Sequence, residues 1–167
     1  GRWDVAADLA RRDGPAAEAL VEWYRLRAGH GSPLEVLEFL DTHADWPGLD
    51  YLRKQSEEAL AEAPDDLILR FYDGYRPQTG LGSLSQASAL LSVGRKGEAE
   101  ANLVLAWRTL DLSTEEHNTF LARHAKLLEP HHAARLDMAQ WRGLRDVSLM
   151  LPLAEDEKLK TIETARM

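Results

Sequence analysis

The histidines are the first side chains in this sequence that could bind a metal or transfer a proton. His117 and His124 are seven residues apart, which places them two turns apart on one face of a helix. A metal site needs further ligands converging on the same point, and the neighbouring Glu116 points elsewhere. His131 and His132 are adjacent and diverge on a helix, so they cannot chelate one ion together. The pattern predicts packed or solvated histidines and no metal centre.

The acidic clusters are the second candidate for chemistry, because glycosidases use two carboxylates that flank a cleft in different environments. The sequence has four runs of adjacent acids: Glu57-Glu58, Asp65-Asp66, Glu115-Glu116 and Glu155-Asp156-Glu157. Three of these runs lie near predicted helix N-termini, where the helix dipole favours negative charge. All four are expected to be solvated helix ends or faces. The sequence therefore predicts no catalytic, cofactor-binding or metal-binding residue and no cofactor.

A glycine-rich stretch, residues 80–83 (GLGS), superficially resembles a phosphate-binding loop. It lacks a Lys-Ser or Lys-Thr pair and no strand is predicted before it, so the likeness carries little weight. We expect an ordinary loop over Gly74 to Gly82, with Ser83 as the N-cap of the next helix. That loop also contains three polar side chains: Arg76, Gln78 and Thr79.

Five tryptophans lie within or beside predicted apolar helix faces: Trp3, Trp23, Trp46, Trp107 and Trp141. Aromatic rings can stack on sugar rings, so contact with a glycan is one interpretation. Packing in the core is the preferred interpretation, because each indole contributes a large share of the burial around it.

Composition excludes several classes of function for these 167 residues. The net charge of −8 and pI near 5.2 argue against nonspecific nucleic-acid binding, which needs clustered Lys and Arg. The sequence has no cysteine, which excludes disulfides and thiolate metal sites. It has no run of 18 apolar residues that could span a membrane, and no signal peptide is recognisable in it.

Helices are predicted along the whole chain, and no strand. β-Branched residues are scarce, while Ala, Leu, Glu and Arg dominate the periodic segments. About ten helices are expected, joined by short loops. Their approximate ranges are Trp3–Arg12, Pro15–Ala28, 33–45, 49–60, 65–72, 83–94, Gly97–Thr109, 113–128, Pro130–Arg142, Leu144–Leu151 and 156–167.

Residues 29–60 give the clearest local prediction, a pair of helices joined by a sharp corner. Ser32 with Glu35 three residues later is a capping box at a helix start. Pro47 ends that helix at or before Trp46, and Gly48 allows a reversal into the next one. Many such hairpins favour a superhelical α-solenoid rather than one bundle.

Further support for a solenoid comes from the segment around the predicted helix Gly97–Thr109. Its apolar positions lie on one face: Ala99, Leu103, Ala106, Trp107 and Leu110. Gly94, Ala99 and Ala106 also match the small-residue spacing of tetratricopeptide repeats, although the rest of that consensus is missing. We therefore expect degenerate, tetratricopeptide-like repeats in a single superhelical domain over residues 1–167.

The segment from Trp23 to Leu60 resembles the N-terminal helical region of soluble lytic murein transglycosylases. The matching residues are Trp23, Leu26, Arg27, Gly29, Phe39, Leu40, His43, Asp45, Trp46, Pro47, Gly48, Leu49, Leu52 and Arg53, while Ala44 replaces the usual Pro. Residues 77–143 also look like the next segment of this family, so the resemblance covers nearly the whole chain.

The resemblance implies a function for the parent protein rather than for this chain alone. Such enzymes are periplasmic lyases that cleave the MurNAc–GlcNAc bond of cell-wall peptidoglycan and leave a 1,6-anhydro end. Their catalytic Glu, followed by Ser, belongs to a lysozyme-like domain C-terminal to the helical region. This chain contains no Glu-Ser dipeptide, and its Ser56-Glu57 pair has the reverse order. The chain is therefore expected to be a non-catalytic scaffold that positions this catalytic domain and contacts glycan strands. The alternative is a tetratricopeptide-like adaptor that binds protein partners.

Overall fold

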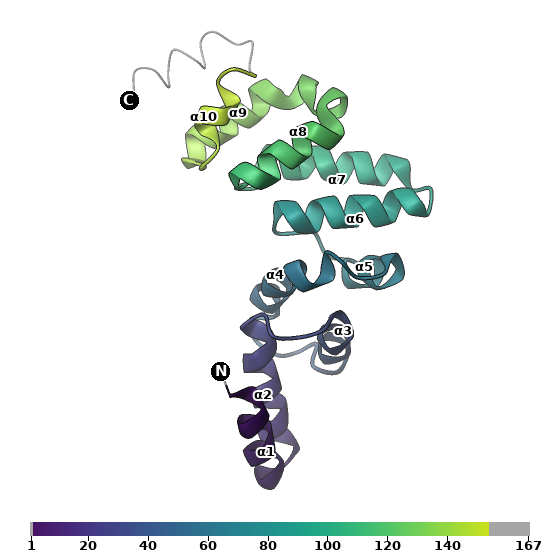
Figure 1. Ribbon diagram of the computed structural model, residues 1–167, viewed down its shortest axis with the longest axis vertical. Coiled ribbons are helices and arrows are strands. Elements are labelled where there is room, and N and C mark those ends of the chain that lie inside the picture. The colour runs from purple at the N-terminus through teal and green to yellow at the C-terminus, as the bar shows by residue number, and fades with distance from the viewer. Residues whose placement is uncertain (1, 154–167) are drawn as a thin grey trace. The chain divides into compact units, whose positions relative to one another are not determined.

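The structure, a computed structural model, describes residues 2–153 (Figure 1). All regular secondary structure in this range is helical, and no strand occurs in it. The predicted all-α class is therefore confirmed. No helix in the described range is both long enough and apolar enough to cross a bilayer. The chain divides into two compact units, Gly1–Phe71 and Tyr72–Met167, and the expectation of a single domain over 1–167 stays a prediction.

The described residues of the first unit form α1 (Trp3–Asp13), α2 (Pro15–Arg27), α3 (Pro33–Thr42), α4 (Leu49–Leu60) and α5 (Asp65–Phe71). Helices α1 and α2 pair as a hairpin, α2 also packs on α4, and α3 lies against α4 and α5. The most deeply buried apolar side chains of this unit come from α2 to α5: Leu26, Val36, Leu37, Leu52, Leu60, Ile68 and Phe71.

The predicted corner over residues 29–60 is confirmed. The Ser32 hydroxyl accepts from the Glu35 backbone N–H, and the Glu35 carboxylate accepts from the Ser32 backbone N–H at 2.8 Å. Gly48 has a φ of +68° and comes directly before α4, a conformation that residues with a Cβ rarely adopt. The chain therefore reverses at Pro47 and Gly48, as the sequence predicts.

The described residues of the second unit form α6 (Gly80–Ser92), α7 (Lys96–Thr109), α8 (Thr114–Leu128), a 3₁₀ turn (Glu129–His131), α9 (His132–Arg142) and α10 (Val147–Met150). Helices α6 and α7 form a hairpin, and α7 also packs against α8 and α9. Four of the five apolar positions predicted for the inner face of α7 are buried: Ala99, Leu103, Ala106 and Trp107.

The predicted start of α6 is wrong. The helix begins at Gly80, inside the segment expected to be a loop, and Thr79 is its N-cap: the Thr79 hydroxyl accepts from the Gly82 backbone N–H at 3.0 Å. Ser83 lies in the first turn and donates to the Thr79 carbonyl oxygen. Gly80 is present for a packing reason, because a Cβ there would lie 2.8 Å from side-chain atoms of both Leu112 and Glu116.

The helix boundaries after Leu128 also differ from the prediction. Pro130 lies in the 3₁₀ turn, and α9 begins only at His132. The helix expected over Leu144–Leu151 is the short α10, because the Gly143 backbone is left-handed and the helix begins only at Val147. The helix expected over 156–167 lies outside the described residues. Gly143 does end α9, as predicted.

Candidate functional site

The principal candidate site is a cleft in the first unit, between α1, α2 and α3. Its volume is about 750 Å³, which is within the usual range of ligand pockets. Helices α1 and α2 contribute an apolar wall that includes Trp3, Ala7 and Ala19. Ionisable side chains from these helices and from the residue after α3 also line it: Asp4, Arg11, Glu18, Glu22, Arg25, Glu35 and His43.

Arg25 organises one side of this cleft. Its guanidinium donates two hydrogen bonds to the Glu22 carboxylate at 2.9 and 2.7 Å, one to Glu35 at 2.6 Å and one to the His30 carbonyl oxygen at 2.6 Å. Glu22 precedes Arg25 by one helical turn, whereas Glu35 lies on α3, so the cluster ties α2 to the start of α3.

The charges of this cluster stabilise one another. Hydrogen bonding to Glu22 raises the pKa of Arg25 further above its ordinary value. Hydrogen bonds from the Ser32 backbone N–H and hydroxyl, followed by the contact with Arg25, lower the pKa of Glu35. A general acid needs a raised carboxyl pKa, so Glu35 is in the opposite condition from a catalytic proton donor.

An aromatic cluster closes the end of the cleft near the corner. The His43 ring stacks on Phe39, with centroids 4.4 Å apart and planes 14° apart, and both residues line the cleft. Trp46 packs its ring at a steep angle against both, at centroid distances of 5.2 Å from His43 and 5.5 Å from Phe39. The His43 ring therefore packs as part of the aromatic cluster.

Trp23 joins this cluster to the corner itself. Its indole N–H donates to the Pro47 carbonyl oxygen at 3.2 Å, and its ring lies 6.0 Å from Trp46. The Arg27 guanidinium lies 4.3 Å from the Trp23 ring centroid, within the range of a cation–π contact. A Cβ on Gly48 would be 3.5 Å from Arg27, so α2 passes close to the reversal.

The two histidines predicted to share one helix face have separate environments. His117 is buried, its Nδ1 lies 2.9 Å from the Asp146 carboxylate, and its ring packs on Trp107 with a centroid separation of 5.0 Å. His124 lies at a break in α8, where its φ is −133°. No group of three potential metal ligands occurs among residues 2–153.

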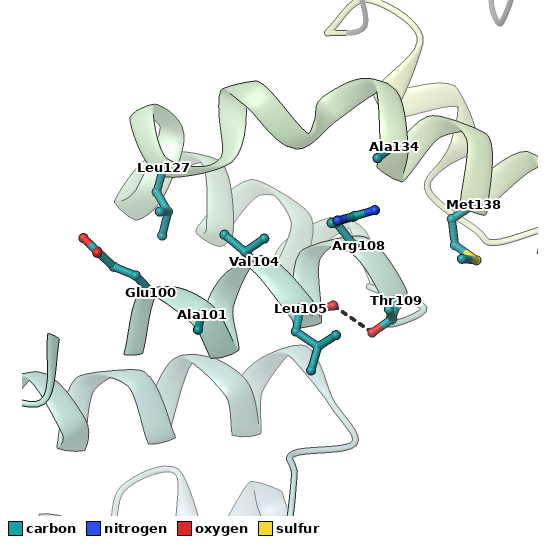
Figure 2. Close-up of a pocket in the computed structure, with 9 residues that line it drawn as sticks. All are labelled: Glu100, Ala101, Val104, Leu105, Arg108, Thr109, Leu127, Ala134 and Met138. Atoms are coloured by element: carbon teal, nitrogen blue, oxygen red, sulfur yellow. Dashed lines mark hydrogen bonds between the residues drawn. The ribbon is translucent and has the colours of Figure 1, made fainter. Parts of the chain in front are cut away.

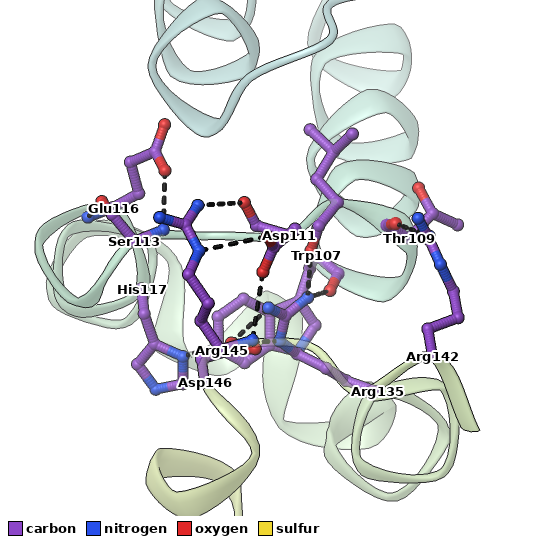
Figure 3. Close-up of polar contacts among 11 residues, drawn as sticks. Trp107, Thr109, Asp111, Ser113, Glu116, His117, Arg135, Arg142, Arg145 and Asp146 are labelled. Carbon is purple, nitrogen blue, oxygen red and sulfur yellow. Dashed lines mark hydrogen bonds and ion pairs between the residues drawn. The ribbon is translucent and has the colours of Figure 1, made fainter. Parts of the chain in front are cut away.

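His117 belongs to a buried polar network in the second unit (Figure 3). Asp146 accepts hydrogen bonds from Arg135, and both side chains are almost fully buried. Arg135 also donates to the carbonyl oxygens of Trp107 and Leu110, at the C-terminal end of α7. Burial raises the pKa of the Asp146 carboxyl, but hydrogen bonds from His117 and Arg135 outweigh that effect and hold the pKa below its usual value.

This network forms hydrogen bonds with the protein's own backbone. The Arg135 guanidinium satisfies helix-end carbonyls that have no partner within α7. Its neighbours Arg142 and Arg145 make similar contacts at the surface, to the Thr109 carbonyl oxygen and to Asp111 (Figure 3). The cluster therefore connects α7, α8, α9 and the turn before α10.

Two expectations about acids and tryptophans are wrong. Glu57 is 2% exposed rather than solvated, because it shares the inward side of α4 with Leu60. Trp141 is 86% exposed rather than packed in a core, since the inward face of α9 is formed by Arg135, Leu136, Ala139 and Gln140. The prediction holds for Trp23 and Trp107, which are buried. The cluster over 155–157 lies outside the described residues.

A second hollow, in the second unit, is mainly apolar (Figure 2). Its volume is about 600 Å³, and it lies between α7, the end of α8 and α9. Val104, Leu105, Leu127 and Met138 contribute large apolar side chains to its lining, which also includes Glu100 and Arg108. It brings together no set of groups suited to acid–base or nucleophilic chemistry.

Sequence reasoning did not find the charged residues around which both units are organised. Glu22 and Arg25 have the three-residue spacing of an ion pair within a helix, so the sequence alone could have predicted this pair. Arg135 and Asp146 carry no such signal, because their pairing depends on the turn after α9. Comparisons of the chain with protein families, with curated proteins and with solved structures find no match.

Proposed function

We propose that this chain is a non-catalytic helical scaffold from a soluble lytic murein transglycosylase. The observation that carries the proposal is the role of the residues that resemble that family. Trp23, Arg27, Trp46, Pro47 and Gly48 form one contact cluster, described above, at the corner that joins α2, α3 and α4. The resemblance thus lies in residues that form a framework rather than in residues with free reactive groups.

Other members of the matching set support the same role. Leu26, Phe39, Leu40 and Leu52 are buried in the first unit. Arg53 donates from its guanidinium to the Phe71 carbonyl oxygen at 2.8 Å, which satisfies the last residue of α5. These side chains fix the packing of successive helices, as a scaffold requires.

We infer further that the helices belong to a superhelical solenoid. In support, neighbouring helices pair as hairpins within each unit, α1 with α2 and α6 with α7. Ala99 and Ala106, the two small residues of the repeat-like spacing, are buried on α7, and Gly94 has a φ of +78° at the turn before it. The proposed partners are the lysozyme-like catalytic domain of the same polypeptide and glycan strands in the periplasm.

Digestion of purified sacculi tests the absence of catalysis. The chain alone should release no 1,6-anhydro-muropeptides detectable by liquid chromatography and mass spectrometry, while an active transglycosylase added to the same sacculi should release them. Anhydro products from the chain alone would contradict the scaffold assignment. Sequencing the gene beyond the codon for Met167 tests the parent protein, since a lysozyme-like domain with a Glu-Ser pair is expected there.

A protein-interaction adaptor is the second candidate, and the apolar hollow between α7, α8 and α9 favours it. Val104, Leu105 and Met138 offer a surface on which the apolar side chains of a partner could pack (Figure 2). The gene beyond Met167 separates the two candidates, because an adaptor predicts no lysozyme-like domain there.

A further inference from the structure

We propose that the cleft between α1, α2 and α3 binds a basic peptide segment of a partner protein, one that carries at least two Lys or Arg side chains. The inference goes beyond the scaffold function and does not depend on it. It is based on the charge of the cleft, on the placement of that charge and on the apolar wall beside it.

The charge of the cleft is negative and only partly compensated. Four carboxylates line it, those of Asp4, Glu18, Glu22 and Glu35, against the guanidinium groups of Arg11 and Arg25. Glu22 and Glu35 share Arg25, as described above. Arg11 forms an ion pair with Asp8, which lies outside the cleft lining, so part of its charge is already neutralised.

Asp4 and Glu18 are the carboxylates available to a ligand. Both are exposed, and neither forms a hydrogen bond or an ion pair with another residue in the range 2–153. Asp4 is in the first turn of α1 and Glu18 is in the first turn of α2, and these helices pair as a hairpin, so the two carboxylates are separated along its length. A peptide with two basic side chains can pair with both carboxylates in one molecule.

The apolar wall of the cleft suits the aliphatic part of a Lys or Arg side chain. Trp3, Ala7, Ala19 and Val21 lie beside the carboxylates and offer apolar surface. Lys and Arg lay their aliphatic stems along such surface while the charged head stays at a polar rim. The Trp3 ring can add a cation–π contact to a bound ammonium or guanidinium group.

Isothermal titration of the whole chain with pentalysine amide at low ionic strength tests the proposal. We expect saturable binding that weakens as salt is added, since exposed charges are screened. The double variant Asp4→Asn/Glu18→Gln should raise the Kd roughly fivefold to tenfold, because two exposed ion pairs are removed. Circular dichroism should show unchanged helix content, since neither carboxylate forms a hydrogen bond or an ion pair within residues 2–153.

The matched control is Glu62→Gln, which removes one exposed carboxylate of the same unit outside the cleft. It should leave the Kd within twofold of that of the unchanged chain, and Glu18→Lys should weaken binding more than Glu18→Gln does. An equal Kd for the chain and the double variant would overturn the proposal. If cadaverine binds as tightly as pentalysine, the cleft is a site for small amines and the proposal of a peptide ligand is overturned. If pentalysine does not bind, the proposal of a cation-binding cleft is overturned as well.

Discussion

The Glu116 carboxylate accepts a hydrogen bond from the Leu81 backbone N–H at 2.9 Å, across 35 residues of sequence. Its other oxygen accepts from the Ser113 backbone N–H at 2.8 Å in the capping box of α8. One side chain thus satisfies N–H groups at the starts of two helices, α6 and α8. Negative charge is favourable at both positions, because each lies at the positive end of a helix dipole.

Replacement of Glu116 by Ala should therefore destabilise the second unit. Loss of one helix cap costs about 0.5–2 kcal/mol, so loss of this double contact is expected to cost about 1–3 kcal/mol, measured by urea denaturation. Glu115→Ala is the control: Glu115 is exposed in the same turn, and its loss should cost under about 0.5 kcal/mol. Equal effects of the two variants would contradict the double-capping role.

Two glycines that lie in helices should respond in opposite directions to Ala. Gly80→Ala puts a Cβ 2.8 Å from Leu112 and Glu116, and we expect a loss of about 1–3 kcal/mol. Gly97→Ala, in the first turn of α7, meets no atom within 4 Å and should stabilise by about 0.4–1 kcal/mol. Thermal unfolding of the two variants side by side measures the difference, and a stabilising Gly80→Ala would show that the α6–α8 contact is loose.

The buried ion pair of Arg135 and Asp146 should be far more sensitive than an exposed one. Arg135→Met leaves a buried carboxylate without its main partner, and this is expected to cost about 3–5 kcal/mol. The exposed pair of Arg145 and Asp111 serves as control, because Arg145→Met should cost under about 1 kcal/mol. Similar denaturation midpoints for the two single variants would contradict the structural importance of the buried network.

Stability of the second unit should fall on acidification. Burial lowers the pKa of His132, and burial with the nearby charge of Arg123 lowers that of His124. A histidine with a lowered folded-state pKa contributes stability that is present above its unfolded value of about 6.5 and is lost as the pH falls through the folded-state pKa. The lowered pKa of Asp146 adds a second loss as the pH falls below the unfolded carboxyl value of about 3.9.

Thermal unfolding over a series of pH values measures both losses. His124→Gln should flatten the profile just below neutral pH and leave the more acidic loss unchanged. Asn118→Gln, at an exposed and non-titrating position of α8, is the control and should leave the profile as it is. A profile of the unchanged chain that is flat between neutral pH and the carboxyl range would contradict the histidine contribution.

Trp107 and Trp141 should differ sharply in their contribution to folding. Trp107 is fully buried and packs against His117 and Phe120, so Trp107→Ala is expected to cost about 3–5 kcal/mol. Trp141→Ser should change the unfolding free energy by less than about 0.5 kcal/mol, because the ring is 86% exposed. Denaturant titrations of both variants give the comparison, and a large loss for Trp141→Ser would indicate a packing role absent from the described contacts.

The features that the sequence predicts well depend on contacts within one or two turns. The capping boxes at Ser32 and Ser113 each need residues only three positions apart, and Gly143 ends α9 through its own backbone conformation. The face of α7 follows from helical periodicity. Such signals are legible in sequence because the atoms involved are neighbours along the chain.

The features that the sequence missed depend on distant partners. The start of α6 is determined partly by Glu116, and the cleft requires α1, α2 and α3 to be placed around Arg25. Trp141 lies in a predicted helix, as Trp23 and Trp107 do, but the face that α9 buries leaves it at the surface. The absence of a catalytic, metal or cofactor site stays a prediction.

The contact between Leu81 and Glu116 also bears on the order in which the chain acquires structure during synthesis. A nascent chain that has not yet reached Glu116 leaves the Leu81 N–H without its side-chain acceptor. Thr79 can already cap the first turn of α6 at that stage, and the Glu116 carboxylate joins it after the start of α8 has emerged. The start of α6 is therefore completed by a residue that is synthesised later than the helix itself. Hydrogen exchange of the Leu81 amide in stalled nascent chains of increasing length can follow this step.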